Sequence, residues 1–330
     1  MKRILVIHTF GMGDMIMFTP ALQELIKKYP DARIDFLVFQ KIAAYPIKNA
    51  PQINQIFYAS FTLSSLIQTV VKLREQEYDL SLVTSGTNPL KASLFSFLIG
   101  AKERIGEYRD FKIPFLYTKN ILYIEQKHRV ENNLDLLNCQ KTSFGVQYYL
   151  QTKERSKRRD KPIKVGFHIG SNKMFAKKRW KADYFEKLIF LLKKDFNSLD
   201  IVIFSGEDEK EESKKLALKT DSVLYLNLPF DTMASKIAEC DLFINSDSGL
   251  GHIASCFDVE IFTIFGPAKA YKAKPFSKNA TVITLGLSCQ PCYGTRDFQR
   301  CRHLDCLNRL SAKSVFEKIK KESKVLKNAK

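Results

Sequence analysis

The sequence lacks the features that mark membrane and secreted proteins. It contains no run of about 20 predominantly apolar residues, the length that a membrane-spanning helix needs. The longest uncharged stretch, residues 49–71, includes a proline and several glutamine, asparagine, serine and threonine residues. The apolar run at residues 4–7 is too short for the core of a signal peptide. These absences predict a cytoplasmic protein.

Cysteine is scarce as well. Seven cysteines in 330 residues, an odd number in a chain without an export signal, predict reduced thiols and not a disulfide framework. With 45% hydrophobic and 27% charged residues, the composition excludes a mainly disordered or collagen-like chain. The net charge is +18, and both halves are basic. Such a balance predicts attraction to polyanions, namely nucleic acid, anionic lipid or phosphorylated substrates.

Apolar β-branched runs alternate with helical patterns, and this alternation predicts parallel α/β sheets. In the first half we expect a buried helix at residues 89–99, another helix at residues 62–76, and strands at 3–8, 34–39 and 79–84. The alternation restarts after residue 162, with helices between strands at 163–169, 200–205, 222–227, 241–245 and 259–265.

The length of the chain predicts two domains. Residues 151–162 are almost entirely polar and basic and end in proline, so they are the best candidate for a linker, with a solvated surface loop as the alternative. We therefore expect one α/β domain at 1–155, a second at 156–310, and a C-terminal segment at 311–330 that forms one helix over 311–327 with Ser311 as its N-cap. Ligands of open parallel sheets bind beyond the carboxyl ends of the strands, so functional residues should follow strands and face a cleft between the domains.

The first candidate motif is Gly11-Met12-Gly13-Asp14, between a predicted strand and a predicted helix. Glycines there allow a tight turn and a close approach of the backbone to a ligand. The motif is not the full dinucleotide fingerprint, because residue 16 is Ile where a third glycine is expected. Asp14 is then either a helix cap or a general base.

The second motif, residues 246–252, directly follows a predicted strand. Its small residues lead into a helix, whose exposed N–H groups attract phosphate. His252 lies about one turn inside that helix, where a buried structural histidine is the alternative to a ligand contact. Asp247 is either a helix cap or a ligand for a sugar or ribose hydroxyl.

Two further segments follow predicted strands. Residues 173–180 bring Lys177, Lys178 and Arg179 next to the only tryptophan, Trp180. Basic residues on such a loop suit a diphosphate, although a solvated run of charges is the usual alternative. The turn at residues 265–267 has the sequence Phe-Gly-Pro and precedes several lysines, and alone it indicates little.

Together these segments resemble glycosyltransferase family 9, the lipopolysaccharide heptosyltransferases. The resemblance rests on MGDMIMFTPAL (12–22), the Lys-Arg-Trp segment, NSDSGLGHIAS (245–255) and IFGPAKAYKAKP (264–275), with order and spacing kept up to about residue 310. It implies an α/β GT-B fold of two Rossmann-like domains, an N-terminal one that binds the acceptor and a C-terminal one that binds the nucleotide sugar. It also implies inverting sugar transfer without a required metal or cofactor.

The resemblance carries the role of catalytic base to Asp14. It carries the stabilisation of the leaving diphosphate to Lys178. An acidic residue of the family falls among Glu207, Asp208 and Glu209; the match among the three stays open, and Glu209 is the one placed in the donor-binding set. Ser248 replaces the threonine of many members and keeps the hydroxyl. The donor-binding set that the resemblance implies is Gly13, Lys178, Glu209, Asp247, Ser248, Gly249 and His252.

The cysteines near the end of the chain form a separate candidate site. Cys289, Cys292, Cys301 and Cys306 have spacings like those of a four-thiolate zinc site, which would be structural because it leaves no open position. Cys289 and Cys292 also resemble a redox pair, but they do not open a helix after a first strand. Free packed thiols are the third interpretation.

The leading hypothesis is a glycosyltransferase that moves heptose from a nucleoside-diphosphate donor, by resemblance ADP-heptose, to the lipid-linked lipopolysaccharide inner core. The chain contains no strict Asp-x-Asp sequence, which fits a metal-independent reaction. The positive charge fits peripheral contact with the inner face of the inner membrane. The alternatives are another sugar or acceptor within the family and, much weaker, a nucleic-acid-binding protein, because the basic residues are dispersed and no RNA- or DNA-binding motif occurs.

Overall fold

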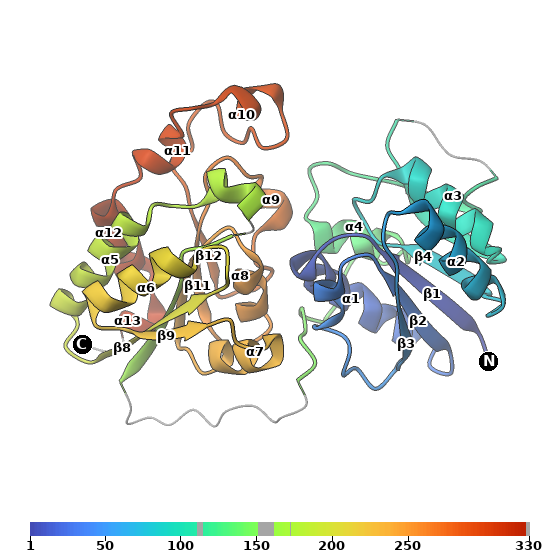
Figure 1. Cartoon of the computed structure of the whole chain (residues 1–330), viewed down its shortest axis with the longest axis horizontal. Helices are drawn as coiled ribbons and strands as arrows, with labels where there is room; N and C mark the ends of the chain where they lie inside the picture. Colours follow the sequence, from blue (N-terminus) through green and yellow to red (C-terminus); the bar gives the residue numbers. More distant parts are fainter. Residues whose placement is uncertain (111–114, 151–161, 172, 328–330) are drawn as a thin grey trace. The chain divides into compact units, whose positions relative to one another are not determined.

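The computed structural model describes residues 1–110, 115–150, 162–171 and 173–327 (Figure 1). The chain divides into two compact units, Met1–Gln151 and Thr152–Lys330. The boundary predicted at residue 155 and the candidate linker up to residue 161 lie outside the described residues.

Unit 1 contains a six-stranded parallel sheet in the order β3-β2-β1-β4-β5-β6. The order reverses between β1 and β4, because the chain moves outward from β1 in one direction and then returns to pair β4 on the other side. Its strands are β1 (Arg3–His8), β2 (Arg33–Val38), β3 (Ile53–Tyr58), β4 (Leu80–Val83), β5 (Glu103–Tyr108) and β6 (Lys119–Leu122).

The helices of unit 1 cover this sheet. Helices α2 and α3 pack on one apolar cluster, which includes side chains from β1, β2, β3 and β4, while α1 packs against α4. The bounds are α1 (Met12–Lys28), η1 (Lys41–Ala44), α2 (Leu63–Arg74), α3 (Pro89–Ile99) and α4 (Arg129–Asp135).

Unit 2 repeats the arrangement with the strand order β12-β11-β10-β7-β8-β9, all pairs parallel. Strands β7, β10 and β11 are buried because they lie in the middle of the sheet, between layers of helices. The strands are β7 (Ile163–His168), β8 (Leu199–Ser205), β9 (Val223–Leu226), β10 (Leu242–Ser246), β11 (Glu260–Ile264) and β12 (Ala280–Ile283).

The helices of unit 2 include α12, which packs against α5 and contributes to the main core of this unit. The C-terminal segment is therefore part of unit 2. The bounds are η2 (Lys173–Lys178), α5 (Ala182–Asp195), α6 (Lys210–Thr220), α7 (Phe230–Ala238), α8 (Gly249–Ala254), α9 (Ala270–Ala273), α10 (Arg296–Arg300), α11 (Asp305–Asn308), α12 (Ala312–Glu322) and α13 (Lys324–Lys327).

The single helix predicted over residues 311–327 is wrong in one respect. Ser311 caps α12 as expected, by accepting a hydrogen bond from the Ser314 N–H at 3.1 Å. The helix stops at Ser323, whose backbone is extended. Glu260 at the start of β11 accepts hydrogen bonds from the Ser323 hydroxyl and the Lys324 N–H, at 2.5 and 2.8 Å, and this carboxylate starts the separate helix α13.

The buried helix predicted at residues 89–99 is also only partly correct. Helix α3 has these bounds, but its buried residues are Ala92, Ser93, Ser96 and Ile99, whereas four of its larger apolar side chains are exposed, namely Leu90, Leu94, Phe97 and Leu98. The prediction that this helix is buried is therefore wrong for its outward face, because nearly uniform hydrophobicity does not show which side of a helix faces the solvent. Among the described residues, no helix is both long enough and apolar enough to cross a bilayer.

Candidate functional site

Asp14 lies in the first turn of α1, directly after β1. Gly11 occupies the N-cap position with an extended backbone, and its residue type provides no capping side chain. Asp14 is therefore not the cap of this helix. Its carboxylate is 29% exposed and lies 3.7 Å from Arg129 of α4. Gly13 precedes it in the same turn.

Arg129 is held firmly in place beside Asp14. Its Nη1 donates to the carbonyl of Ser85 at 2.7 Å, and the guanidinium lies over the ring of Phe10 at 5.3 Å. Gly86 makes room for it: a Cβ on Gly86 would lie 1.6 Å from that nitrogen, and the residue has a positive φ of 86°. A fixed cation thus faces the first-turn carboxylate.

Two buried titratable groups surround this pair. Burial lowers the pKa of His8 to about 4, although the Asp14 carboxylate acts in the opposite direction. His8 is therefore neutral near pH 7, hydrogen-bonded to Thr84 at 2.9 Å. Burial likewise raises the pKa of Glu107, which accepts a hydrogen bond from the Gly86 N–H at 2.8 Å. Near Asp14, the buried atoms Arg129 Nε, Ser85 Oγ and Glu107 Oε1 have no hydrogen-bond partner within the described residues.

In unit 2 the predicted donor-site residues gather at one edge of the sheet. The segments that carry them follow β7, β8 and β10, which are neighbours in the sheet, and their carboxyl ends meet at that edge. Trp180 anchors the first segment: its backbone N–H donates to the Ser246 hydroxyl at 3.1 Å and its indole N–H to the Leu310 carbonyl at 2.9 Å.

The centre of this edge is an ion pair between Lys178 and Asp247. The Lys178 Nζ donates to the Asp247 Oδ2 at 3.1 Å, and only 15% and 12% of the two side chains are exposed. The same ammonium lies 4.0 Å from the ring centroid of Tyr293 and 5.1 Å from that of Phe175. Cation–π contacts of this kind hold the ammonium while leaving part of its hydrogen-bonding capacity for a ligand.

The neighbouring basic residues have other partners. Lys177 donates to carbonyls at the end of α10, including that of Gln299 at 3.2 Å. Arg179 lies 3.6 Å from Glu209 and also donates to Ser171. The three basic side chains thus serve three different sites, and the segment is not a uniformly solvated run of charges.

Helix α8 carries the other predicted residues of this edge. Ser248 is its N-cap with no capping bond from its side chain, and Gly249 begins the helix. Gly251 is required by packing, since a Cβ there would lie 2.4 Å from the Asn245 amide nitrogen. His252 is 6% exposed and belongs to the buried part of the helix.

Glu209 is 5% exposed and bound by the protein itself. It accepts from the Gly206 N–H at 2.7 Å and lies 3.7 Å from His168. A Cβ on Gly170 would lie 2.1 Å from its carboxyl carbon. Glu209 therefore joins the loops that follow β7 and β8, whereas Glu207 is exposed. The contact of Glu209 with the donor stays a prediction.

The cysteine segment folds back onto the turn at residues 265–267. The N–H groups of Cys292 and Tyr293 both donate to the Pro267 carbonyl, at 3.0 and 2.9 Å. Gly266 fits because a Cβ would lie 2.6 Å from Leu307 of α11. These contacts place Tyr293 beside Lys178.

All seven cysteines are free thiols. Burial, together with the nearby Cys292, Cys289 and Cys301, raises the pKa of Cys306 to about 11. Nevertheless, within the residues that the structure describes, no group of three or more His, Cys, Asp or Glu side chains is arranged to hold a metal ion. The zinc prediction stays untested.

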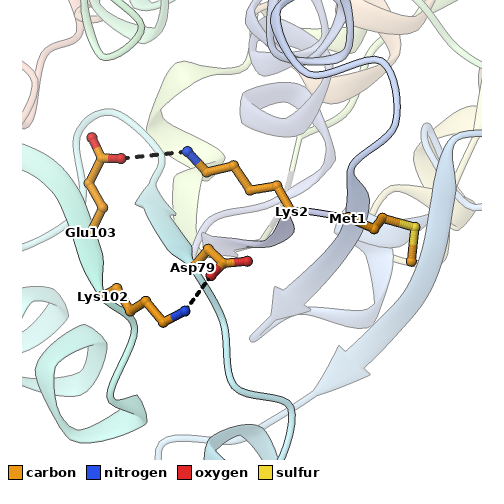
Figure 2. Close-up of a pocket in the computed structure, with 5 residues that line it drawn as sticks. All are labelled: Met1, Lys2, Asp79, Lys102 and Glu103. Carbon is orange, nitrogen blue, oxygen red and sulfur yellow. Dashed lines mark hydrogen bonds and ion pairs between the residues drawn. The ribbon is translucent and has the colours of Figure 1, made fainter.

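A large hollow of about 680 Å³ lies elsewhere, at the amino ends of the unit 1 strands. Figure 2 shows its charged side chains paired with one another, Lys2 with Glu103 at 3.7 Å and Lys102 with Asp79 at 2.8 Å. The Lys102 hydrogen bond lowers the pKa of Asp79. Ligands of parallel sheets bind at the opposite, carboxyl ends, so we do not assign this hollow a ligand.

Two Rossmann-like α/β units, each a six-stranded parallel sheet covered by helices, form a GT-B fold. The solved structure of Escherichia coli ADP-heptose lipopolysaccharide heptosyltransferase II has this fold, with a TM-score of 0.74, 20% identity and coverage of 97% of this chain and 98% of that chain. The E. coli heptosyltransferase WaaC with ADP-2-deoxy-2-fluoro heptose is similar, with a TM-score of 0.74, 19% identity and coverage of 97% and 100%.

Residues 66–303 match the model of glycosyltransferase family 9 (heptosyltransferase), and the chain belongs to this family. It is therefore a glycosyltransferase. Among curated relatives, the lipooligosaccharide heptosyltransferase 2 of Campylobacter jejuni serotype O:2 is 26% identical, and the alignment covers 96% of each chain.

Sequence reasoning missed Arg129, Tyr293 and Asn245. Arg129 lies far from Asp14 in the chain, at the start of a short helix with no motif of its own. Tyr293 was hidden inside the cysteine-rich segment. Asn245 directly precedes the second motif, and this position is the one signal in the sequence that could have identified it. Its side chain is buried, and its amide oxygen accepts a hydrogen bond from Thr263 at 2.9 Å.

Proposed function

We propose that this protein transfers a heptose from a nucleoside-diphosphate heptose, with ADP-heptose as the preferred donor, to the lipopolysaccharide inner core. Its family supports the transfer of heptose. The C. jejuni relative is named a lipooligosaccharide heptosyltransferase, and the solved WaaC structure contains an ADP-heptose analogue. The likeness to both extends over nearly the whole chain.

The observation that carries the proposal is the Lys178–Asp247 pair at the carboxyl edge of unit 2. A nucleotide sugar needs a cation for its diphosphate and an acceptor for sugar or ribose hydroxyls, and the pair supplies both. Aromatic contacts fix the ammonium before the donor arrives, so that little reorganisation is required during the reaction. Gly13, Ser248, Gly249 and His252 complete the proposed donor-binding set, together with Glu209.

In the proposed reaction, Asp14 removes the proton from the attacking acceptor hydroxyl. The acceptor oxygen forms a bond to the anomeric carbon as the bond from that carbon to the diphosphate oxygen breaks. Attack from the face opposite the leaving group inverts the configuration. Lys178 offsets the charge that develops on the nucleoside diphosphate, and no metal ion is required.

The first test is thermal stabilisation by a panel of nucleotides and nucleotide sugars, because a ligand that binds the folded state raises the melting temperature. A shift with ADP and ADP-heptose, and none with UDP or GDP compounds, is expected. A selective UDP or GDP shift would keep the enzyme class and refute the heptose donor. A shift with RNA or DNA alone would favour the nucleic-acid hypothesis.

The second test is steady-state transfer to a purified inner-core acceptor. Asp14→Asn is expected to lower kcat by about a hundredfold or more while the ADP-induced thermal shift remains. Lys178→Ala is expected to weaken donor binding and slow turnover, whereas Lys181→Ala, at an exposed lysine directly after this segment, serves as the control. Equal turnover of Asp14→Asn and the parent would exclude the assigned base. Transfer in excess chelator and the anomeric configuration of the product test metal independence and inversion.

We further propose that the protein works in the cytoplasm, in peripheral contact with the inner face of the inner membrane. A lipid-linked acceptor must be reached at that surface, and the net charge of +18 favours an anionic leaflet.

A further inference from the structure

Helix α3 exposes much of its apolar surface. Its inward face carries Ala92, Ser93, Ser96 and Ile99, and the Ser96 hydroxyl is hydrogen-bonded to that of Ser81 at 2.5 Å. Its outward face carries apolar side chains that are between 41% and 58% exposed, namely Leu90, Leu94, Phe97 and Leu98. Their spacing of four, three and one residues places them on one stripe of the helix.

Helix α2 carries a second exposed stripe, formed by Leu63, Ile67 and Val71, which are 75%, 56% and 55% exposed. The intervals of four residues again place these side chains on one side of the helix. The helix is fixed from beneath by Leu73, which is fully buried in the cluster on the sheet.

The two stripes belong to one surface. Both helices pack on the same apolar cluster of the unit 1 sheet, so their outward sides face away from that sheet together. The two helices lie side by side (Figure 1). Arg74 at the end of α2 donates to the Leu98 carbonyl of α3 at 3.2 Å and joins them. We call the seven exposed apolar side chains the α2–α3 face: Leu63, Ile67, Val71, Leu90, Leu94, Phe97 and Leu98.

The charges on these helices have one sign. Lys72, Arg74 and Lys91 lie within α2 and α3, which contain no acidic residue, and Glu75 follows only at the C-cap of α2. Arg104 extends the basic border, with its guanidinium 5.4 Å from the Phe97 ring. Apolar side chains bordered by lysine and arginine form the pattern of helices that lie in the interface of an anionic bilayer.

We propose that the α2–α3 face docks on an anionic lipid bilayer. The apolar stripes enter the boundary between headgroups and acyl chains, and the basic side chains bind phosphate groups of the lipids. A second copy of the chain is a poorer occupant, because a self-complementary interface would bring the same cations together. The inference deepens the proposed function, since a lipid-linked acceptor lies at such a surface.

The test is co-sedimentation of the full chain with vesicles of phosphatidylcholine alone or mixed with phosphatidylglycerol. We expect binding to the anionic vesicles that weakens as salt rises. Leu94→Glu/Leu98→Glu should bind about tenfold more weakly or worse, because each leucine loses its burial in lipid. The matched control is Leu218→Glu, on an 86% exposed leucine of α6 in unit 2, which should bind like the parent.

A second variant, Lys72→Gln/Lys91→Gln, should weaken binding to the anionic vesicles only, and it leaves the apolar side chains in place. Parent protein that does not bind, or that binds both vesicle types equally, would overturn the proposal. So would equal binding of the Leu94/Leu98 variant and the control, or a dimer in solution that this variant abolishes.

Failure of this inference is distinguishable from failure of the proposed function. The thermal shift with ADP and transfer to a detergent-dispersed acceptor test the donor site alone, and both should be unchanged in the Leu94/Leu98 variant. Loss of vesicle binding with these intact supports the docking face. If the parent protein has an intact donor site but does not bind vesicles, only the docking face is refuted.

Discussion

Replacing Gly86 by alanine is expected to destabilise unit 1 through Arg129. The new Cβ would lie 1.6 Å from the Arg129 Nη1 and 2.5 Å from its Cζ, far inside van der Waals contact. Because the guanidinium is the end of a flexible side chain, it moves aside while the backbone stays. It then loses its hydrogen bond to the Ser85 carbonyl and its position beside Asp14.

The expected loss in the free energy of unfolding has two parts. Alanine at a φ of 86° adds backbone strain of about 1–2 kcal/mol. Loss of the hydrogen bond from a charged, 14% exposed guanidinium adds about 1.5–3 kcal/mol. The expected loss in the free energy of unfolding is therefore about 2.5–5 kcal/mol.

The chain offers a matched control for the strain alone. Gly100 ends α3 with a φ of 81°, and a Cβ there would meet no atom within 4 Å. Gly100→Ala should therefore cost only about 1–2 kcal/mol. In an Arg129→Ala background, the excess cost of Gly86→Ala over Gly100→Ala should disappear, because the displaced group is already absent.

Chemical denaturation can separate the two units, since the only tryptophan, Trp180, lies in unit 2. Far-UV circular dichroism follows both units, whereas tryptophan fluorescence follows unit 2. Gly86→Ala should shift the transition seen by circular dichroism alone. Equal costs for Gly86→Ala and Gly100→Ala, or an excess that survives Arg129→Ala, would refute the reasoning.

Three further outcomes are expected. Glu209→Gln should destabilise unit 2 by about 3–5 kcal/mol in the fluorescence transition, because it breaks a buried ion pair, whereas the exposed Glu207→Gln should have little effect; the reverse order would contradict the buried network. As pH falls from 6.5 towards 4, His8 takes up a proton in the unfolded chain but not in the folded one, so unit 1 should lose about 3 kcal/mol of stability. His8→Asn should lessen this loss. An acid transition that is unchanged in this variant would show that other groups control it. Metal analysis of protein purified without chelator should find less than about half an equivalent of zinc, and a full equivalent would restore the four-thiolate site.

Sequence reasoning succeeded where local chemistry determines structure. The β-branched runs gave most central strands within one or two residues, because buried parallel strands are continuous apolar segments. The strands β3, β5, β6 and β12 were not predicted; Arg104 and Glu107 in β5 and the polar residues of β3 interrupt that pattern. The motifs at residues 11–14 and 246–252 were placed correctly after β1 and β10, because glycines and small residues mark such turns.

The partners of the site residues were beyond the reach of sequence. Lys178 and Asp247 are 69 residues apart, and Arg129 follows Asp14 by more than a hundred. A lysine among other lysines carries no sign of which one will be enclosed by Tyr293 and Phe175. The sheet order decides this, because β7 and β10 are neighbours in space and not in sequence.

Helix α3 shows why hydrophobicity alone misleads. A helix that is apolar on most sides is usually buried, and the sequence 89–99 was interpreted in that way. At Ser96 the sheet accepts only a small side chain, because the hydroxyl of Ser81 in β4 lies 2.5 Å from that of Ser96. Four of its larger side chains lie outside, where their exposure costs free energy unless another apolar phase covers them, namely Leu90, Leu94, Phe97 and Leu98. The same packing constraint that made the sequence prediction wrong thus produces the surface for which we propose a bilayer.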